Sequence, residues 1–246
     1  MRLYDEIIRD ILTFLGEQDA HILPVGAAAD PVSRDWQDAG KAMMILQSDM
    51  AYELGGHNLP AVGNTLVTTG KDFVPEDEII LIGKDLPEIT EDTPYARIAL
   101  VRVAEDSIGT GDRLYNTIRN IGYFRYHIYP KGFMLRVSSS NDRESVRVEA
   151  EALNEGLNFT AIGNAMIRAL HLHKEVEAVR IIFVTDPKVD YGRLQDGLKK
   201  TKQITATIDH MLKDVNMDCG SCGLQEICDE IEGLREMHFG MSEGHT

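Results

Sequence analysis

Three short apolar runs rich in β-branched residues constrain the fold of this 246-residue chain more than any other feature. They span residues 79–82, 98–103 and 179–184, and a further short apolar run lies between the last two, at 133–137. Runs of this kind that are bounded by Gly, Pro or Asp are typical of buried strands. Because helical patterns separate them between about residues 78 and 200, we expect an α/β fold in which a mixed sheet is flanked by helices.

Four stretches repeat apolar residues at helical spacing and therefore predict helices. They span residues 4–16, 111–124, about 160–173 and 191–213, and we interpret the last as either one helix or a pair. The dipeptide Asp186-Pro187 follows the last predicted strand. We expect a helix to start there, because proline is tolerated at the first helical position.

The chain divides into three parts on this pattern. After the first helix, the sequence up to about residue 75 is rich in Gly, Ala and Pro, so we expect mostly turns and short elements there. The predicted organisation is an N-terminal helix and irregular region packed on the core (1–75), an α/β core domain (76–214) and a short C-terminal Cys/His metal-binding segment (215–246).

Composition excludes several classes of protein. Apolar residues make up 43% of the chain and charged residues 26%, as in a soluble globular protein with a sizeable core. Forty acidic against 25 basic residues give a formal charge of -15, which repels phosphate backbones and anionic lipids, so we expect neither a nucleic acid nor a membrane partner. The sequence has no run of 18 apolar residues and no apolar N-terminal signal, and we expect a cytoplasmic protein.

All three cysteines fall within ten consecutive positions, as Cys219, Cys222 and Cys228 in a C-x2-C-x5-C pattern. Crowding of this kind in an unsecreted chain favours metal ligation over a disulfide framework. A redox disulfide between the first two is an alternative, since C-x-x-C also serves thioredoxin-type chemistry. The helical, charged stretch that precedes them argues against that alternative, and the remaining interpretation is three buried or free thiols.

A fourth donor is needed, because zinc and the iron of iron–sulfur clusters each take about four ligands and thiolates suit both. His238 is the next donor downstream and is separated from Cys228 by nine residues. It completes a Cys3His set, although a partly exposed histidine on a helix is the alternative interpretation. Spacing alone slightly favours zinc.

Four stretches occur in the same order as motifs of a known family. They are Glu53-Leu-Gly-Gly56, Ile80-Leu-Ile-Gly-Lys-Asp-Leu86, Met134-Leu-Arg-Val-Ser138 and Ile181-Ile-Phe-Val-Thr-Asp186. Together they resemble the A-cluster-bearing subunit of the acetyl-CoA synthase and acetyl-CoA decarbonylase/synthase family, over roughly three quarters of the chain. The residues before about position 40 have no counterpart in that resemblance.

The resemblance has implications for the cysteine segment. In that family a C-x2-C-x8-C-x9-C segment holds an iron–sulfur cubane, whereas the present chain has C-x2-C-x5-C-x9-H. The resemblance thus implies that Cys219, Cys222 and Cys228 occupy the first three ligand positions, with His238 in place of the fourth cysteine. It changes the expected cofactor from zinc to a 4Fe-4S cluster. The Cys-Gly-Cys motif that holds the family's second nickel is absent from this sequence, so the family's carbon–carbon and thioester bond formation is not inferred.

We therefore expect an iron–sulfur protein accessory to carbon monoxide, acetyl-CoA or corrinoid one-carbon metabolism, acting by electron transfer or by handling a metal or cluster. Its expected partner is a protein of the CO dehydrogenase/acetyl-CoA synthase or corrinoid system, and a second copy of the chain is also considered. The alternative is a non-catalytic interaction module with a structural Cys3His zinc site.

An enzyme with its own catalytic machinery is the third hypothesis. Neither a Ser-His-Asp spacing nor a phosphate-binding G-x-x-x-x-G-K motif is present. His57 and Asn58 are interpreted as part of a turn, and residues 76–78 as a solvated charge run. His171 and His173 are two residues apart on a predicted helix and so make a poor metal-binding pair.

Overall fold

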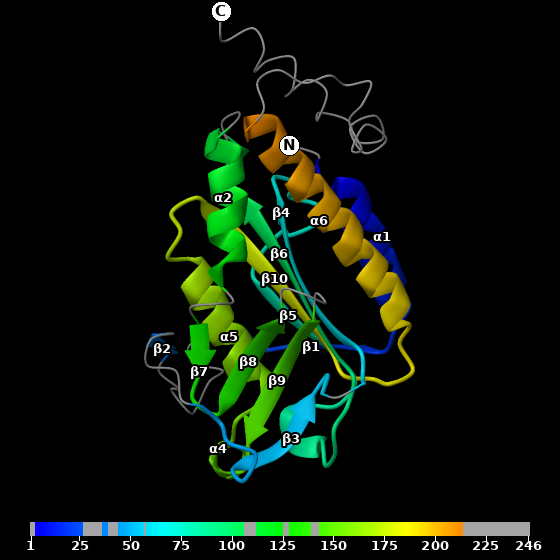
Figure 1. Ribbon diagram of the computed structural model, residues 1–246, viewed down its shortest axis with the longest axis vertical. Coiled ribbons are helices and arrows are strands. Elements are labelled where there is room, and N and C mark those ends of the chain that lie inside the picture. Colours follow the sequence, from blue (N-terminus) through cyan, green and yellow to red (C-terminus); the bar gives the residue numbers. More distant parts are fainter. Residues whose placement is uncertain are drawn as a thin grey trace, which may run out of the picture.

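An open mixed sheet of eight strands forms the centre of the part of the chain that the structure describes (Figure 1). The computed structural model describes residues 3–26, 36–38, 44–56, 58–105, 112–124, 128–138 and 143–213. The strand order is β1-β5-β10-β6-β4-β9-β3, and β8 pairs with β9. The strands are Ala20–Leu23 (β1), Met50–Leu54 (β3), Ala61–Thr68 (β4), Glu78–Ile82 (β5), Tyr95–Val103 (β6), Phe133–Ser138 (β8), Arg143–Glu149 (β9) and Val176–Val184 (β10). A separate pair joins β2 (Trp36–Asp38) to β7 (Ile128–Pro130).

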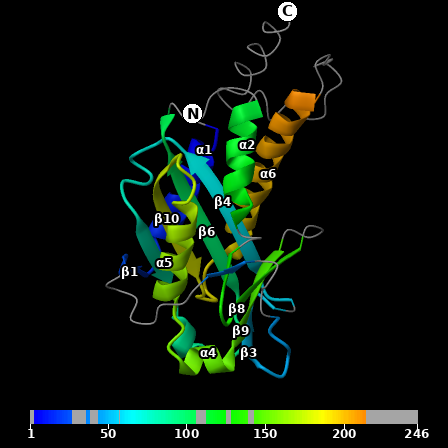
Figure 2. The same ribbon diagram turned by 90° about the vertical axis from the view of Figure 1, so that its left-hand side faces the viewer.

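Helices cover both faces of this sheet (Figures 1 and 2). The helices are Asp5–Gly16 (α1), Asp112–Gly122 (α2), Ala150–Asn154 (α4), Phe159–Leu170 (α5) and Tyr191–Lys213 (α6), with a 3-10 turn at Leu86–Glu88 (η3). Asn64 of β4 donates a hydrogen bond to Thr201 of α6, which lies beside α1. Ile79 of β5 packs against Gly163 of α5. Strand pairing places Ile79 on the face opposite Asn64, so α1 and α6 cover one face and α5 the other.

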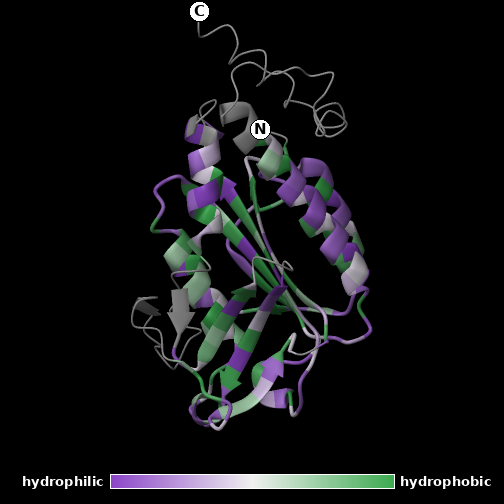
Figure 3. Ribbon diagram, in the orientation of Figure 1, coloured by the Kyte–Doolittle hydropathy of each residue, from purple (hydrophilic) through white to green (hydrophobic). Residues whose placement is uncertain are grey.

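The central strands are almost entirely buried, because both of their faces are covered. Eight of the nine residues of β6 are buried, and the three apolar runs of the sequence form β5, β6 and β10 at the centre of the fold (Figure 3). β10 runs parallel to β5 and antiparallel to β6, and β6 runs parallel to β4. The predicted α/β class, with a mixed sheet flanked by helices, is therefore confirmed.

The four predicted helices are all present. They form α1, α2, α5 and α6, and the last is one helix of 23 residues rather than a pair. On α1, five apolar side chains on one face are buried: Ile7, Ile8, Ile11, Phe14 and Leu15. Burial of this apolar face against the sheet and α6 is what holds a 12-residue helix in water, where it would be marginal alone.

A helix start at Asp186-Pro187 is a wrong prediction. The carboxylate of Asp186 accepts a hydrogen bond from the backbone N–H of Lys188 at 2.9 Å, which makes a turn, and the helix begins at Tyr191. The side-chain hydrogen bond of an aspartate competes with helix formation in this way.

The expectation of mostly turns before residue 75 is wrong for β4. This eight-residue strand pairs with β6 along its whole length. Gly63, Asn64 and Thr65 interrupt its apolar pattern. Asn64 donates a hydrogen bond to Thr201 of α6, and Thr65 accepts one from Arg97 of β6. A Cβ at Gly63 would lie 2.0 Å from the carboxylate of Glu144, so only glycine fits. Because strand propensity depends on such neighbours, the local pattern did not reveal the strand.

Strand β9 leaves the main sheet beside β4. The two strands pair at Val62 and Arg143, after which β9 continues with β3 and β8 as a small antiparallel lobe (Figure 1). At this fork the fully buried Arg97 of β6 donates two hydrogen bonds to the buried carboxylate of Glu144, at 2.6 and 2.8 Å. The guanidinium also lies over the ring of Phe124, 5.1 Å from its centre. This ion pair connects the lobe to the central strands.

No helix among the described residues is long and apolar enough to cross a lipid bilayer. The predicted metal-binding segment at 215–246 lies outside the described residues.

Candidate functional site

The lobe of β3, β8 and β9 contains a cavity of about 560 Å³, which we call the arginine pocket. Its volume is within the range of about 300–1,000 Å³ that small-molecule sites occupy. Strand β8, strand β9 and the segment from Gln47 to Gly56 form its walls. The lining residues are Gln47, Met50, Glu53, Gly55, Gly56, Arg136, Val137, Ser138, Arg143, Ser145 and Arg147.

The alternation of strand side chains brings the polar residues of β9 together. Arg143, Ser145 and Arg147 point to the pocket, while the buried residues between them point to the core. Residues two apart in a strand share one face, so these three line one wall. Arg136 and Ser138 follow the same rule on the neighbouring strand β8.

Glu53 supplies the negative charge of the pocket. Its side chain is 6% exposed, and its carboxylate accepts a short hydrogen bond from the guanidinium of Arg136. The Nε of Arg147 lies 3.9 Å from the same carboxylate oxygen. A buried carboxylate is costly unless it is paired and hydrogen-bonded, so Glu53 holds two arginines in place while they neutralise its charge.

Arg143 has a different role, because it holds the turn after β3. Its Nη2 donates hydrogen bonds to the backbone oxygens of Gly55 at 2.7 Å and of Leu59 at 2.8 Å. Gly55 has a φ of +66°, and a Cβ there would lie 2.5 Å from the Cβ of Ala61. Glycine is therefore required at this position, and the turn closes one end of the pocket.

The pocket is positively charged within a strongly acidic protein. Among the described residues that line it, three arginines stand against one glutamate, whereas the whole chain carries a formal charge of -15. The side chain of Arg136 is 44% exposed and reaches solvent at the pocket. Guanidinium groups match the geometry of carboxylate and phosphate oxygens, and two serine hydroxyls add donors. The arrangement can bind a small oxyanion.

The predicted metal ligands Cys219, Cys222, Cys228 and His238 lie outside the described residues, as does His57. The described chain leads toward the cysteines through α6, which ends at Lys213. Within the described ranges, no group of three or more His, Cys, Asp or Glu side chains is placed to hold a metal ion.

The interpretation of residues 76–78 as a solvated charge run is wrong for two of its members. The carboxylate of Asp77 accepts a hydrogen bond from the backbone N–H of Val179 at 2.8 Å and lies 2.9 Å from the Nε2 of His171. Glu78 forms an ion pair with Arg180 of the adjacent strand β10, with 2.6 Å between Glu78 Oε2 and Arg180 Nε. These acidic side chains tie β5 to its neighbours.

The sequence patterns did not predict the arginine pocket as a site, although two of the four motifs that carry the family resemblance meet there. The segments Glu53–Gly56 and Met134–Ser138 supply six of its lining residues: Glu53, Gly55, Gly56, Arg136, Val137 and Ser138. The signal that could have revealed it is the period-two pattern Arg143-x-Ser145-x-Arg147 beside Arg136-x-Ser138.

Comparison with known proteins gives one family match. The model of the family described as CO dehydrogenase/acetyl-CoA synthase complex beta subunit matches residues 37–189, which is more than half of the chain and includes every residue that lines the arginine pocket. No curated protein matches the chain.

Proposed function

Because this chain belongs to the CO dehydrogenase/acetyl-CoA synthase complex beta subunit family, we propose that it is an iron–sulfur protein accessory to the CO dehydrogenase/acetyl-CoA synthase system. The observation that carries the proposal is the compact set Cys219, Cys222 and Cys228, which follows the family-matched scaffold after α6. Electron transfer, or transfer of a metal or cluster to a partner, is the role that such a site supports.

The donor set fits a 4Fe-4S cluster. Cys219, Cys222 and Cys228 would hold three irons through soft thiolates, and His238 would supply the fourth donor. When bound, such a cluster supplies one-electron transfer. Imidazole is neutral and exchanges more readily than a thiolate, so the His238 position supports an altered potential or a replaceable ligand. The partner that we propose is a protein of the CO dehydrogenase/acetyl-CoA synthase or corrinoid system, and a homodimer remains a secondary proposal.

Absorption and metal analysis of anaerobically prepared protein test the cluster. We expect brown protein with the broad visible absorption of sulfide-to-iron charge transfer, and iron and sulfide in equal amounts. His238→Ala should lower the cluster content or change the spectrum, whereas the control His21→Ala, at an exposed position of β1, should change neither. Wild-type protein that stays free of cluster after reconstitution with iron and sulfide would refute the proposal. An unchanged spectrum and metal content in His238→Ala would remove only this histidine from the ligand set.

A structural zinc site is the alternative that the same donors support, since Cys3His is a common structural zinc shell. In that case the chain is a non-catalytic interaction module. Colourless protein with one zinc per chain would favour it over the cluster.

The arginine pocket supports a second function, the binding of a small molecule through a carboxylate or phosphate group. The observation that favours it is the excess of positive charge in a cavity of about 560 Å³, whose lining contains three arginines and one glutamate. Two of these arginines are already positioned by Glu53, so little ordering is needed when the anion binds.

A further inference from the structure

The guanidinium of Arg136 has an open edge in the arginine pocket. Its Nη1 donates to Glu53, and the structure records no other hydrogen bond or ion pair between this side chain and the described residues. The Nε–H and the Nη2–H beside it form the other edge of the guanidinium plane. Two parallel donors of this kind match the two oxygens of a carboxylate. An anion can therefore bind Arg136 without breaking its bond to Glu53.

The other two arginines of the pocket mainly hold its walls in place. Arg143 holds the turn after β3, and Arg147 Nη1 donates to the backbone oxygen of Ile45 at 3.0 Å. The Nε of Arg147 is buried. Arg143 and Arg147 are half-buried, whereas Arg136 is exposed. Arg136 is therefore the arginine best placed to contact a ligand, and the other two add positive charge around it.

Glu53 presents a hydrogen-bond acceptor to the same pocket. Its Oε1 accepts from Arg136 and lies 3.9 Å from Arg147 Nε, whereas its Oε2 has no recorded hydrogen-bond partner among the described residues. The buried side-chain atoms that lack a partner in the described part of the chain do not include this Oε2, so it is reached from the pocket. A carboxylate oxygen accepts but does not donate, and the donor must come from a ligand.

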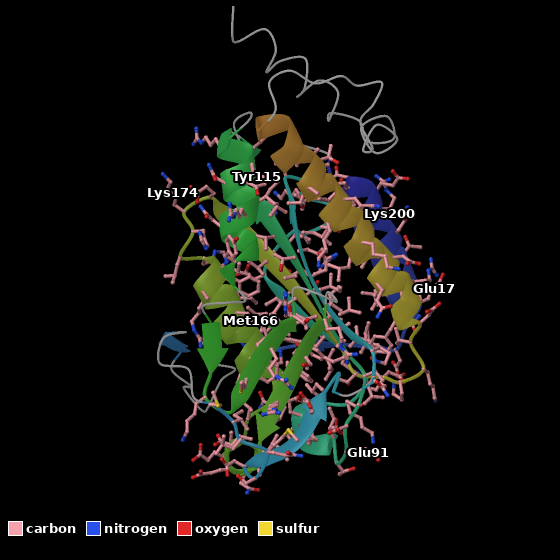
Figure 4. The ribbon with its side chains drawn as sticks, in the orientation of Figure 1. Glu17, Glu91, Tyr115, Met166, Lys174 and Lys200 are labelled. Carbon is pink, nitrogen blue, oxygen red and sulfur yellow. The ribbon has the colours of Figure 1, made fainter. Side chains whose placement is uncertain are left out.

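Gly56 leaves the space beside this oxygen free. A Cβ at Gly56 would lie 2.8 Å from Glu53 Oε2, and Gly56 itself lines the pocket. The backbone N–H of Glu53 donates to the carboxylate of Asp92 at 2.7 Å, in the loop after η3 where Figure 4 labels Glu91. This bond fixes β3 at Glu53, so the open oxygen and the free space beside it are held together.

Ser145 lies between the two charged groups. It is directly opposite Arg136 in the register of β8 and β9, and β9 separates β8 from β3, which carries Glu53. Arg136 thus crosses β9 over a small side chain to reach Glu53. No hydrogen bond of the Ser145 hydroxyl with the residues that the structure describes is recorded. This hydroxyl is therefore available to a ligand that lies between the guanidinium and the carboxylate.

From these open groups we propose that the arginine pocket binds a small hydroxycarboxylic acid. Its carboxylate accepts from Nε and Nη2 of Arg136 and from the hydroxyl of Ser145, and its own hydroxyl donates to Glu53 Oε2. This inference rests on the anion binding proposed above for the pocket and adds the second group of the ligand. The volume of about 560 Å³ is sufficient for a molecule of a few carbon atoms.

Charge favours this class of ligand over two related ones. A phosphate ester carries about −1.5 to −2 charges at pH 7 and is repelled more strongly by the open oxygen of Glu53 than a carboxylate is. An amino acid also offers a donor, but its net charge is zero. Three arginines against one glutamate in the lining favour a ligand with a net negative charge.

Isothermal titration with matched probes tests the two contacts. Glycerate carries a carboxylate and two hydroxyls, propionate has the same number of carbons and the same charge without the hydroxyls, and glycerol lacks the charge. We expect glycerate to bind about tenfold tighter than either, because a hydrogen bond to a charged group is lost with each.

The outcomes separate this inference from the anion binding on which it rests. Equal affinities for glycerate and propionate would refute the hydroxyl contact and leave the anion binding intact. Absence of saturable binding of both at millimolar concentration would overturn both proposals. Tighter binding of glycerol 3-phosphate or of alanine than of glycerate would overturn the assignment to a hydroxycarboxylic acid.

Gly56→Ala tests the position of the hydroxyl. The added Cβ occupies the space beside Glu53 Oε2, and the φ of Gly56 lies outside the left-handed region, so alanine can adopt this backbone. The variant should remove the advantage of glycerate over propionate. The control Gly16→Ala, at the open end of α1 and outside the pocket, should keep it. An unchanged ratio of the two affinities in Gly56→Ala would refute the position.

Arg136→Lys tests the carboxylate contact even where Gly56→Ala does not fold. Lysine keeps a positive charge near Glu53 but lacks the edge with two parallel donors. Glycerate and propionate should both bind about tenfold more weakly to this variant. The control Arg193→Lys, on α6 and outside the pocket, should bind both as wild type does. Wild-type affinities in Arg136→Lys would refute the contact. The cluster proposed for the cysteine segment enters none of these results.

Discussion

Arg97 and Glu144 form a buried ion pair, and we expect their coupling energy in a double-mutant cycle to be several kcal/mol. The net contribution of the pair to the free energy of unfolding should nevertheless be small. Both side chains are at most 1% exposed and are joined by two hydrogen bonds, at 2.6 and 2.8 Å. Burial lowers the pKa of Arg97, but the attraction and hydrogen bonds of Glu144 raise it by more, so the net pKa is above its ordinary value. The guanidinium is therefore charged at every working pH, and removal of Glu144 leaves a buried cation alone.

The magnitudes follow from that burial. Each single replacement, Arg97→Met or Glu144→Leu, should lower the free energy of unfolding by about 3–5 kcal/mol, because an unpaired buried charge remains. The double variant replaces the pair with apolar side chains and should differ from wild type by about 2 kcal/mol or less. The coupling energy from the cycle is then at least about 4 kcal/mol. In a protein of this size, each single variant should melt on the order of 10 °C below wild type.

Urea unfolding followed by far-ultraviolet circular dichroism measures the free energy of unfolding of wild type, the two single variants and the double variant. The dependence of this free energy on urea concentration is compared among them to confirm that the same transition is observed. Single-variant losses below about 1 kcal/mol would contradict the burial of the pair. A double variant that loses the sum of the two single losses would show that the residues act independently and would refute the reasoning.

Three further predictions concern other sites. Gly63→Ala should destabilise the protein by about 1–3 kcal/mol, because its Cβ would lie 2.0 Å from a buried carboxylate oxygen; Gly16→Ala, in open space, should cost nothing in the same urea assay. Arg147→Met should weaken the binding of inorganic phosphate to the arginine pocket by about tenfold, or ~1.4 kcal/mol, in calorimetry, while Arg193→Met, outside that pocket, should leave it unchanged; equal affinities would contradict the pocket. Burial raises the pKa of Tyr4 from 10.0 to about 12, so its contribution to stability is present below pH 10 and is lost as the pH rises toward 12. Between these pH values, Tyr4→Phe should reduce the decrease of the free energy of unfolding with pH by about 1.4 kcal/mol per pH unit in urea titrations. An unchanged pH dependence would contradict the burial of this hydroxyl.

Local pattern was sufficient for the elements whose environment is uniform. The strands β5, β6 and β10 are apolar because both faces of the sheet are covered, and the helices α1 and α6 repeat apolar residues because one face of each is buried. Such periodicities are properties of neighbouring residues, and they are visible without the fold.

Pattern was not sufficient for β4 and β9. Gly63 makes β4 resemble a turn, and its reason lies in Glu144, which is far away in the sequence. Strand β9 alternates strictly between half-buried and buried residues, yet its charged residues mask the alternation until the arginines have a pocket to face. The contact of Glu53 with Arg136 is likewise not visible in the local sequence pattern, because the two residues are far apart along the chain.

The amino-acid sequence by itself determined the α/β class, the central strands, the amphipathic helices, the family resemblance and the cysteine set at 219, 222 and 228. Tertiary structure alone decided the order of the strands, the fork between β4 and β9, and the arginine pocket. The physical reason is that periodicity and residue type act over a few positions, whereas a charge pair or a cavity wall depends on which strands and helices become neighbours, and strand pairing sets that.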